Sequence, residues 1–215
     1  MLFKRIQCNV ARSRREAFRT AQGQWSAVSG VEGFLGQTGG WDGASCERAV
    51  IIAVWRDAGC YGRFMQSDHD AIVERAGQVG TYESIRTDLY EIVSGIEGSA
   101  GTAKDAIRMA GCLRLARCNV RPGRQGHFEQ VQRRIWNPGM AAAGGMLGGF
   151  FCRHRERAAE YLVCTMWRTV KDHRDYRHEI FPRLHGDAEV SLDVKQLVGL
   201  EVAVESGWRV LADDS

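Results

Sequence analysis

The stretch RIQCNV, Arg5 to Val10, decides the fold, because it occurs a second time in the chain as LARCNV, Leu115 to Val120. The two Cys-Asn-Val tripeptides lie 110 positions apart, and Phe18 and Phe128 keep that spacing. Self-similarity at a long fixed period is the sequence signature of a repeated structural unit. Further landmarks follow in the same order.

The later part of each copy keeps the correspondence with a shift of two positions. GFLGQ from Gly33 returns as GMLGG from Gly145, 112 positions on, and the apolar run ending in Trp55 returns as one ending in Trp167 at the same spacing. Chance matches would not stay in order with so small a drift. The chain is thus interpreted as a tandem duplication.

Each copy is predicted to run strand, helix, strand, strand, helix, strand. Alternating and continuous apolar runs indicate the strands, and apolar residues at intervals of three and four indicate the helices. In the first copy the expected elements are 2–10, about 14–28, 31–41, 49–55, 57–76 and 81–93. In the second they are 112–120, a helix over Phe128 and Ile135, 144–151, 161–167, a helix reaching 181, and a strand near 197–211.

This order is the ferredoxin-like βαββαβ arrangement, an α+β fold. Its antiparallel sheet carries helices on one face only, so the other face needs a cover, and two copies supply it for each other. We predict tandem ferredoxin-like modules forming a pseudo-dimeric α/β barrel. The modules are expected at 1–95 and 111–215, joined by a Gly/Ser/Ala-rich linker at 96–110.

Composition narrows the class of protein. With 44% hydrophobic residues and a net charge of +3 over 215 residues, the chain can bury a core and has no basic, aromatic-interleaved patch for nucleic acid. We expect no membrane span and no signal peptide. Seven cysteines without C-x-x-C pairing indicate a reduced, cytoplasmic protein. The histidine spacing fits no metal signature, so neither metal nor cofactor is expected.

Several segments together resemble the dimeric α/β-barrel superfamily that includes antibiotic-biosynthesis monooxygenases. More closely, the chain resembles the YdbC-like family, which carries two such modules in tandem. The matching pieces are MLFKRIQCNV, REAFRTAQGQWSAV, VEGFLGQTGGW, FMQSDHD, HFEQVQRRIWNPGM and GMLGGFF. The resemblance implies ligands held between helices and sheet. The superfamily includes cofactor-independent oxygenases, haem-degrading enzymes and non-catalytic binding proteins.

Asn9 and His69 are the predicted catalytic residues. In haem-degrading relatives an Asn on the first strand acts with a Trp and a His, and Asn9 matches the first of these. The Trp position falls near Phe64, and His69 lies near the position of the His. The alternative is structural: Asn9 and its equivalent Asn119 hydrogen-bond a neighbouring loop, and His69 ends a helix among solvated acids. Strand parity does not decide which face of the sheet Asn9 occupies.

The predicted substrate-binding residues are mostly aromatic. Trp25 and Trp136 look equivalent, yet at the 110 spacing Trp25 matches Ile135. Either one residue is inserted before Trp136, or Trp136 points about 100° around the helix, where it would wall a pocket beside Met140. The remaining predicted pocket residues are Phe64 and Asn119.

These residues leave three functions open. The first is a cofactor-independent oxygenase, or related enzyme, acting on an apolar or aromatic small molecule. The second is a non-catalytic binding or stress-associated protein, and the third is haem binding or degradation. In each case the partner is a small-molecule ligand, and the protein is a monomer with an internal pseudo-twofold or a homodimer.

Overall fold

The computed structural model describes residues 1–213 and divides into two compact units. The first unit is Met1–Leu89 with the C-terminal segment from Val202, and the second is Tyr90–Glu201. The module bounds 1–95 and 111–215 concern the duplication and stay a prediction about it. Positions 214–215 of the second module lie outside the described residues.

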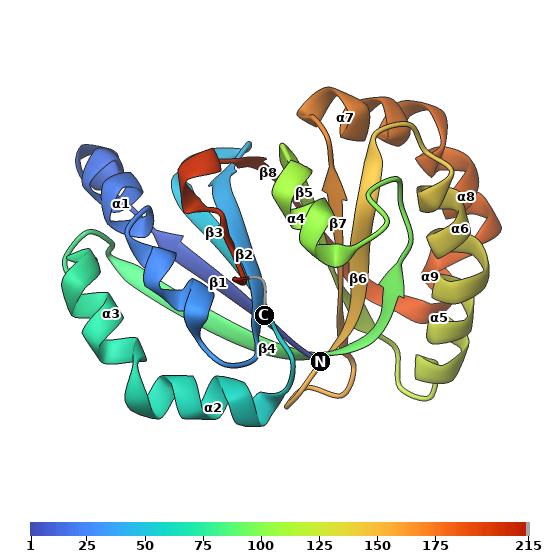
Figure 1. Ribbon diagram of the computed structural model, residues 1–215. Coiled ribbons are helices and arrows are strands. Elements are labelled where there is room, and N and C mark those ends of the chain that lie inside the picture. The colour runs from blue at the N-terminus through green and yellow to red at the C-terminus, as the bar shows by residue number, and fades with distance from the viewer. Residues whose placement is uncertain (214–215) are drawn as a thin grey trace. The chain divides into compact units, whose positions relative to one another are not determined.

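The first unit has the predicted βαββαβ order, and its helices lie on one side of its strands (Figure 1). Its elements are β1 (Leu2–Asn9), α1 (Arg15–Gln22), β2 (Phe34–Asp42), β3 (Ser45–Trp55), α2 (Ala58–Ser67), α3 (His69–Ala76) and the first part of β4 (Ser84–Ile96). 3₁₀ turns lie at Arg12–Arg14, Trp25–Gly30 and Ser206–Trp208, and a short strand β9 at Val210–Leu211.

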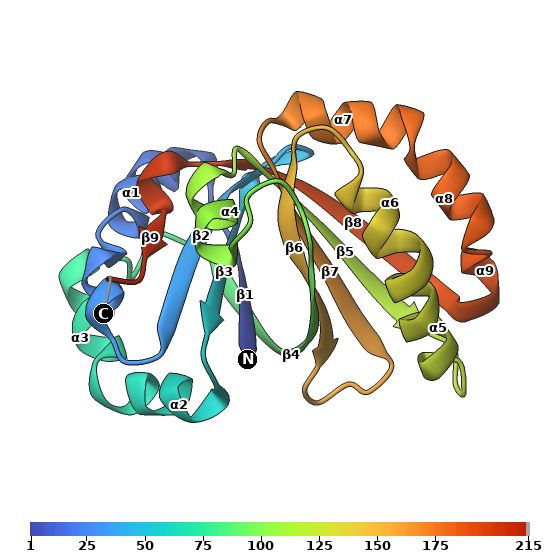
Figure 2. The same ribbon diagram turned by 45° about the vertical axis from the view of Figure 1, so that its right-hand side comes forward.

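The second unit repeats the order, again with the helices of the repeat on one side of its strands (Figure 2). Its elements are α4 (Ala103–Met109), β5 (Cys112–Val120), α5 (Gln125–Val131), a π-helical segment (Gln132–Trp136), α6 (Asn137–Ala141), β6 (Met146–His154), β7 (Glu160–Trp167), α7 (Val170–Glu179), α8 (Phe181–Asp187), α9 (Val190–Asp193) and most of β8 (Val194–Val204).

The strand order is β3-β1-β4-β6-β7-β5-β8-β2, and a β2–β3 pairing closes it. Two strands belong to both units. Within the second unit β4 pairs with β6 from Tyr90 to Ile96, and within the first unit β8 pairs with β2 from Val202 to Val204. Both repeats keep the ferredoxin-like order, so the predicted fold class of tandem modules in a pseudo-dimeric α/β barrel is confirmed.

Three predicted elements differ in detail. The helix expected over 14–28 ends at Gln22 and continues as the 3₁₀ turn Trp25–Gly30. The helix expected over 57–76 breaks at Asp68 into α2 and α3. The segment 96–110, predicted as a linker, contains α4, which Thr102 caps by accepting a hydrogen bond from the Asp105 N–H.

The apolar cores lie between helices and sheet in each unit. In the first unit Trp55 and Phe64 are the centre of one such cluster, and in the second Trp167 and Tyr176 occupy the equivalent places. All seven cysteines are free, and only Cys46 is exposed. Within residues 1–213 no helix combines the length and the apolar character that a membrane crossing requires.

Candidate functional site

The predicted aromatic residues of the first unit come together between its helices and sheet. The ring of His69 lies 6.0 Å from that of Trp25 and 5.7 Å from that of Phe64, measured between centroids. Trp25 donates its Nε1–H to Gln78 at 2.9 Å, and His69 Nδ1 lies 2.8 Å from an Asp70 carboxylate oxygen. Trp25 and Phe64 are both buried in the core cluster. These side chains therefore contact one another and form a packed cluster.

Asn9 does not join that cluster. Leu2 and Cys8 on β1 pack among the helix-side cores, so Asn9 lies on the opposite face of the strand. Its Nδ2 donates to Ser84 Oγ at 2.8 Å, and the residue is exposed. Asn119, at the equivalent place on β5, is also exposed. The structure thus places Asn9 away from Phe64 and His69.

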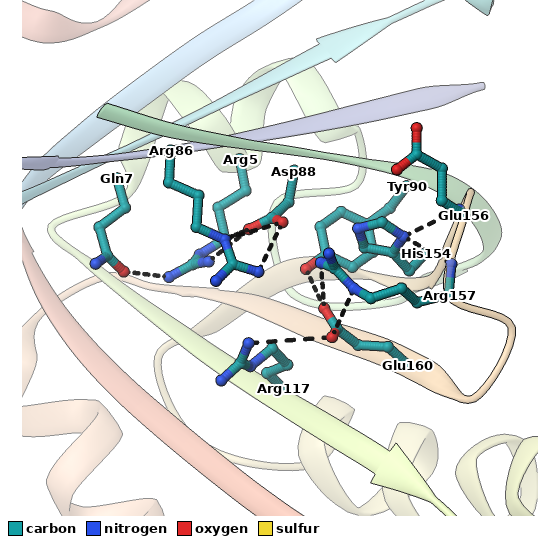
Figure 3. Close-up of polar contacts among 10 residues, drawn as sticks. All are labelled: Arg5, Gln7, Arg86, Asp88, Tyr90, Arg117, His154, Glu156, Arg157 and Glu160. Atoms are coloured by element: carbon teal, nitrogen blue, oxygen red, sulfur yellow. Dashed lines mark hydrogen bonds and ion pairs between the residues drawn. The ribbon is translucent and has the colours of Figure 1, made fainter. Parts of the chain in front are cut away.

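The face of β1 that carries Asn9 also carries the buried cation Arg5, whose charge is compensated by neighbouring side chains. Arg5 is buried there and donates from Nη1 to Asp88 at 3.1 Å and from Nη2 to Gln7 at 2.6 Å (Figure 3). Arg86 also donates to Asp88. In the second unit Glu160 similarly accepts hydrogen bonds from Tyr90 and Arg157 (Figure 3). These ion pairs satisfy buried charge, a structural role.

In the second unit the aromatic cluster recurs with two exchanges, Phe181 for His69 and Tyr176 for Phe64. The ring of Trp136 packs tilted against that of Phe181 at 5.5 Å, as Trp25 packs against His69 at 6.0 Å. The Trp167–Tyr176 pair repeats the Trp55–Phe64 pair at 4.9 Å. The π-helical segment Gln132–Trp136, whose last residue is Trp136, accommodates one extra residue. Of the two interpretations of Trp136, the one-residue insertion therefore accounts for its position.

A cavity of about 270 Å³ lies in the second unit between helices and sheet. Two predicted pocket residues, Trp136 and Met140, line it. The other lining residues are Arg114, Ala116, Cys118, Phe128, Val131, Gln132, Val163, Thr165, His173, Tyr176, Arg177, Phe181, Ala188, Val190, Asp193, Val194 and Leu197. Apolar side chains with a few polar groups are typical of small-molecule sites.

His173 is the most distinctive polar group of this cavity. It is 1% exposed, its Nδ1 lies 2.8 Å from Glu201 Oε2, and its Nε2 is a buried atom without a hydrogen-bond partner in the described chain. Glu201 in turn accepts from Arg174 at 2.9 Å. An imidazole whose Nδ1–H is held by a carboxylate presents Nε2 as a free base or acceptor.

Burial sets the protonation state of this pair. It lowers the pKa of His173 below the ordinary value, although the hydrogen bond to Glu201 acts in the opposite direction. Burial alone would raise the pKa of Glu201, but the hydrogen bonds from Arg174 and His173 hold that pKa below its ordinary value. At neutral pH the pair is therefore a neutral imidazole beside a carboxylate.

His173 and Glu201 were not predicted from the sequence, although the sequence contains a signal for His173. His173 stands three residues before Tyr176 and three after Val170, so it shares the inward stripe of α7. Glu201 lies on a strand with few buried residues, and no pattern pointed to it. Among residues 1–213 no cluster of His, Cys, Asp and Glu has an arrangement suited to a metal ion.

The chain is similar to known proteins both in sequence and in structure. A family model described as a domain of unknown function, DUF4937, matches residues 2–90. YdbC of Bacillus subtilis (strain 168) is 41% identical over 93 residues, which are 42% of this chain and 78% of YdbC.

Two solved structures extend the likeness over nearly the whole chain. A provisionally assigned monooxygenase of Lactobacillus acidophilus NCFM has a TM-score of 0.72, covers 99% of both chains and is 14% identical. Another from Fusobacterium nucleatum subsp. nucleatum ATCC 25586 has a TM-score of 0.76, covers 94% of this chain and 91% of its own, and is 9% identical. At these identities the likeness shows a shared fold alone.

Proposed function

This chain belongs to the family of Bacillus subtilis YdbC, and we propose that it is an enzyme. It binds an apolar, aromatic small molecule in the cavity of its second unit and oxidises that molecule with O₂. The monooxygenase descriptions of the two solved structures agree with this proposal through the fold. The observation that carries it is the unpartnered Nε2 of His173, buried at the wall of a largely apolar cavity.

His173 acts as the general base in this proposal. Its lowered pKa keeps the imidazole neutral, and Glu201 holds the tautomer that leaves Nε2 free. Nε2 removes a proton from an acidic C–H group of the substrate, and Glu201 stabilises the resulting imidazolium. Apolar walls such as Phe128 and Val163 exclude water from the carbanion.

The substrate carbanion supplies the electrons, so the oxidation needs no cofactor. The carbanion passes electrons to O₂, one oxygen atom becomes bonded to the substrate carbon, and the other leaves as water. A CH₂ group and one O₂ thus give a carbonyl group and one water. The first unit, where Trp25, Phe64 and His69 pack together, serves as scaffold in this proposal.

Oxygen uptake with anthrone as the probe substrate tests the proposal. We expect His173→Gln to lower kcat by roughly 100-fold or more, the usual contribution of a general base, with anthrone still bound. His178→Gln, an exposed histidine on the same helix, is the matched control and should leave kcat unchanged. Binding of anthrone without oxygen uptake by the wild-type protein would instead identify a non-catalytic binding protein.

A further inference from the structure

Building on the proposed function, we infer that the ligand of the second-unit cavity is an acid: a planar apolar body carrying one ionised group, such as an aromatic carboxylate, which Arg114 binds. Arg114 lies on β5 and lines the cavity together with His173.

The guanidinium is fixed by backbone and keeps free donors. Nη1 donates to the carbonyl oxygens of Leu115 at 3.0 Å and Leu200 at 3.2 Å. A guanidinium has five N–H donors in a rigid fork. Within the described chain no further hydrogen bond of Arg114 is present, so Nη2 and Nε remain available.

Glycine at position 199 makes this placement possible. A Cβ on Gly199 would lie 1.9 Å from both Nη1 and Nη2 of Arg114, well inside contact distance. The β8 backbone therefore leaves room for the guanidinium to lie directly across the strand. Because the conflict is with the end of a flexible side chain, a side chain at position 199 would displace the guanidinium rather than the strand.

The charges around the cavity leave a positive excess. Asp193, the carboxylate among the lining residues, already has two partners, because it is 2.7 Å from both Arg124 and His127. Glu201 likewise pairs with Arg174 and His173. Over residues 1–213, by contrast, neither Arg114 nor the neighbouring cavity residue Arg177 forms an ion pair.

This excess favours an anion. Burial and then the charge of Arg177 lower the pKa of Arg114, which means that its positive charge is held in an unfavourable place. A carboxylate on a guanidinium removes that penalty through charge-assisted, bidentate hydrogen bonds. The aromatic walls formed by Phe128, Trp136 and Phe181 fit the flat apolar remainder of such a molecule.

The first unit serves as an internal comparison. The position equivalent to Arg114 is Lys4, and the position equivalent to His173 is Tyr61. Lys4 is 7% exposed, and its Nζ lies 5.0 Å above the centre of the Tyr61 ring. The first-unit cation is therefore covered by an aromatic face of its own chain, whereas the second-unit cation faces a cavity.

Calorimetric titration at neutral pH with naphthalene-2-carboxylate and naphthalene-2-carboxamide tests the inference, because the two probes share one aromatic body and only the carboxylate is charged. The wild-type protein should bind the carboxylate at least roughly ten-fold more tightly. In Arg114→Met this preference should fall below about three-fold, with the carboxamide affinity retained. Arg183→Met removes an exposed arginine of α8 and should keep the full preference.

Gly199→Ala is the second variant, because it moves the Arg114 guanidinium without removing it and does not depend on Arg114→Met folding. It should reduce the preference for the carboxylate in the same direction. Equal affinity of the wild-type protein for both probes, or a preference that survives in both variants, overturns the inference while leaving the proposed cavity intact. Binding of neither probe contradicts the proposed function itself, and the inference with it.

Discussion

At the residue scale the cavity is organised by the pair His173 and Glu201. Nδ1 of the imidazole lies 2.8 Å from one carboxylate oxygen of Glu201, and Arg174 donates to the other oxygen at 2.9 Å. In the proposed reaction Glu201 is a positioning residue that acts through His173. The effect of Glu201 on the pKa of His173 distinguishes this role from a contribution to folding alone.

Substitution Glu201→Gln should keep the hydrogen bond to His173 but remove the charge that stabilises the imidazolium. We expect kcat with anthrone to fall roughly ten- to 100-fold, and probe affinity to change less than about three-fold. Because Glu201 raises the pKa of His173, its loss should also move the acid limb of the kcat profile to lower pH. A purely structural role would leave that limb in place.

The pH dependence of stability follows from the same histidine. Its pKa is lowered from the ordinary value of 6.5 on folding, so below 6.5 the unfolded chain takes up a proton before the folded one does. The contribution of the neutral His173 to the free energy of unfolding is therefore fully present above pH 6.5. It is lost as the pH falls through the lowered pKa of the folded state.

Thermal unfolding measured between about pH 7 and pH 5 checks this sign. The melting temperature of the wild-type protein should fall more steeply over this window than that of His173→Phe. His178→Gln, an exposed control on the same helix, should follow the wild-type curve. Equal slopes for the wild-type protein and His173→Phe would mean that His173 is not held neutral by the fold.

Site residues were harder to predict than the fold, for a physical reason. Parity along β1 separates two faces, but Arg5 is buried on one and Lys4 on the other, so polarity does not identify the helix side. The predicted site residues Trp25, Phe64 and His69 lie together, without Asn9. Whether a ligand binds there or in the second-unit cavity depends on packing, which aromatic spacing does not reveal.

At the element scale the duplication is visible in how helices begin. Asp57 caps α2 by accepting a hydrogen bond from the Cys60 N–H, and Thr169, 112 positions on, caps α7 by accepting one from the Asp172 N–H. The helices of the two repeats were predictable from apolar spacing, whereas α4, in the segment predicted as a linker, was not. The break at Asp68 and the π-helical segment at Gln132–Trp136 were not, because each adapts a helix to its neighbours.

The two caps should be energetically equivalent. Asp57→Ala and Thr169→Ala should each lower the free energy of unfolding by about 1 kcal/mol, since each leaves a helix N–H without its acceptor. Asp57→Thr, which installs the residue of the other repeat, should recover most of the loss. Urea unfolding monitored by circular dichroism measures this. A loss well under half this size at both sites would contradict a capping role.

At the scale of the whole molecule, order and spacing of the repeat were enough to predict the tandem ferredoxin-like fold. They did not predict where the compact units divide. Because β4 and β8 each run from one compact unit into the other, the boundaries fall inside strands, after Leu89 and Glu201, rather than in the Gly-rich segment. Hydrophobic alternation continues through such a strand and contains no boundary signal.

The two units differ at the positions on which the proposed reaction depends. Tyr61 and Leu89 of the first unit stand where the second unit has His173 and Glu201, and Lys4 stands where it has Arg114. We therefore propose that the second unit, and not the first, holds the ligand.

Hydrogen exchange followed by mass spectrometry, with and without naphthalene-2-carboxylate, tests that claim most directly. We predict that the ligand slows exchange in the segments bordering the cavity, 125–140, 170–181 and 190–201, and leaves 58–76 in the first unit unchanged. Protection confined to 58–76, around Phe64 and His69, would contradict the account and return the site to the first unit.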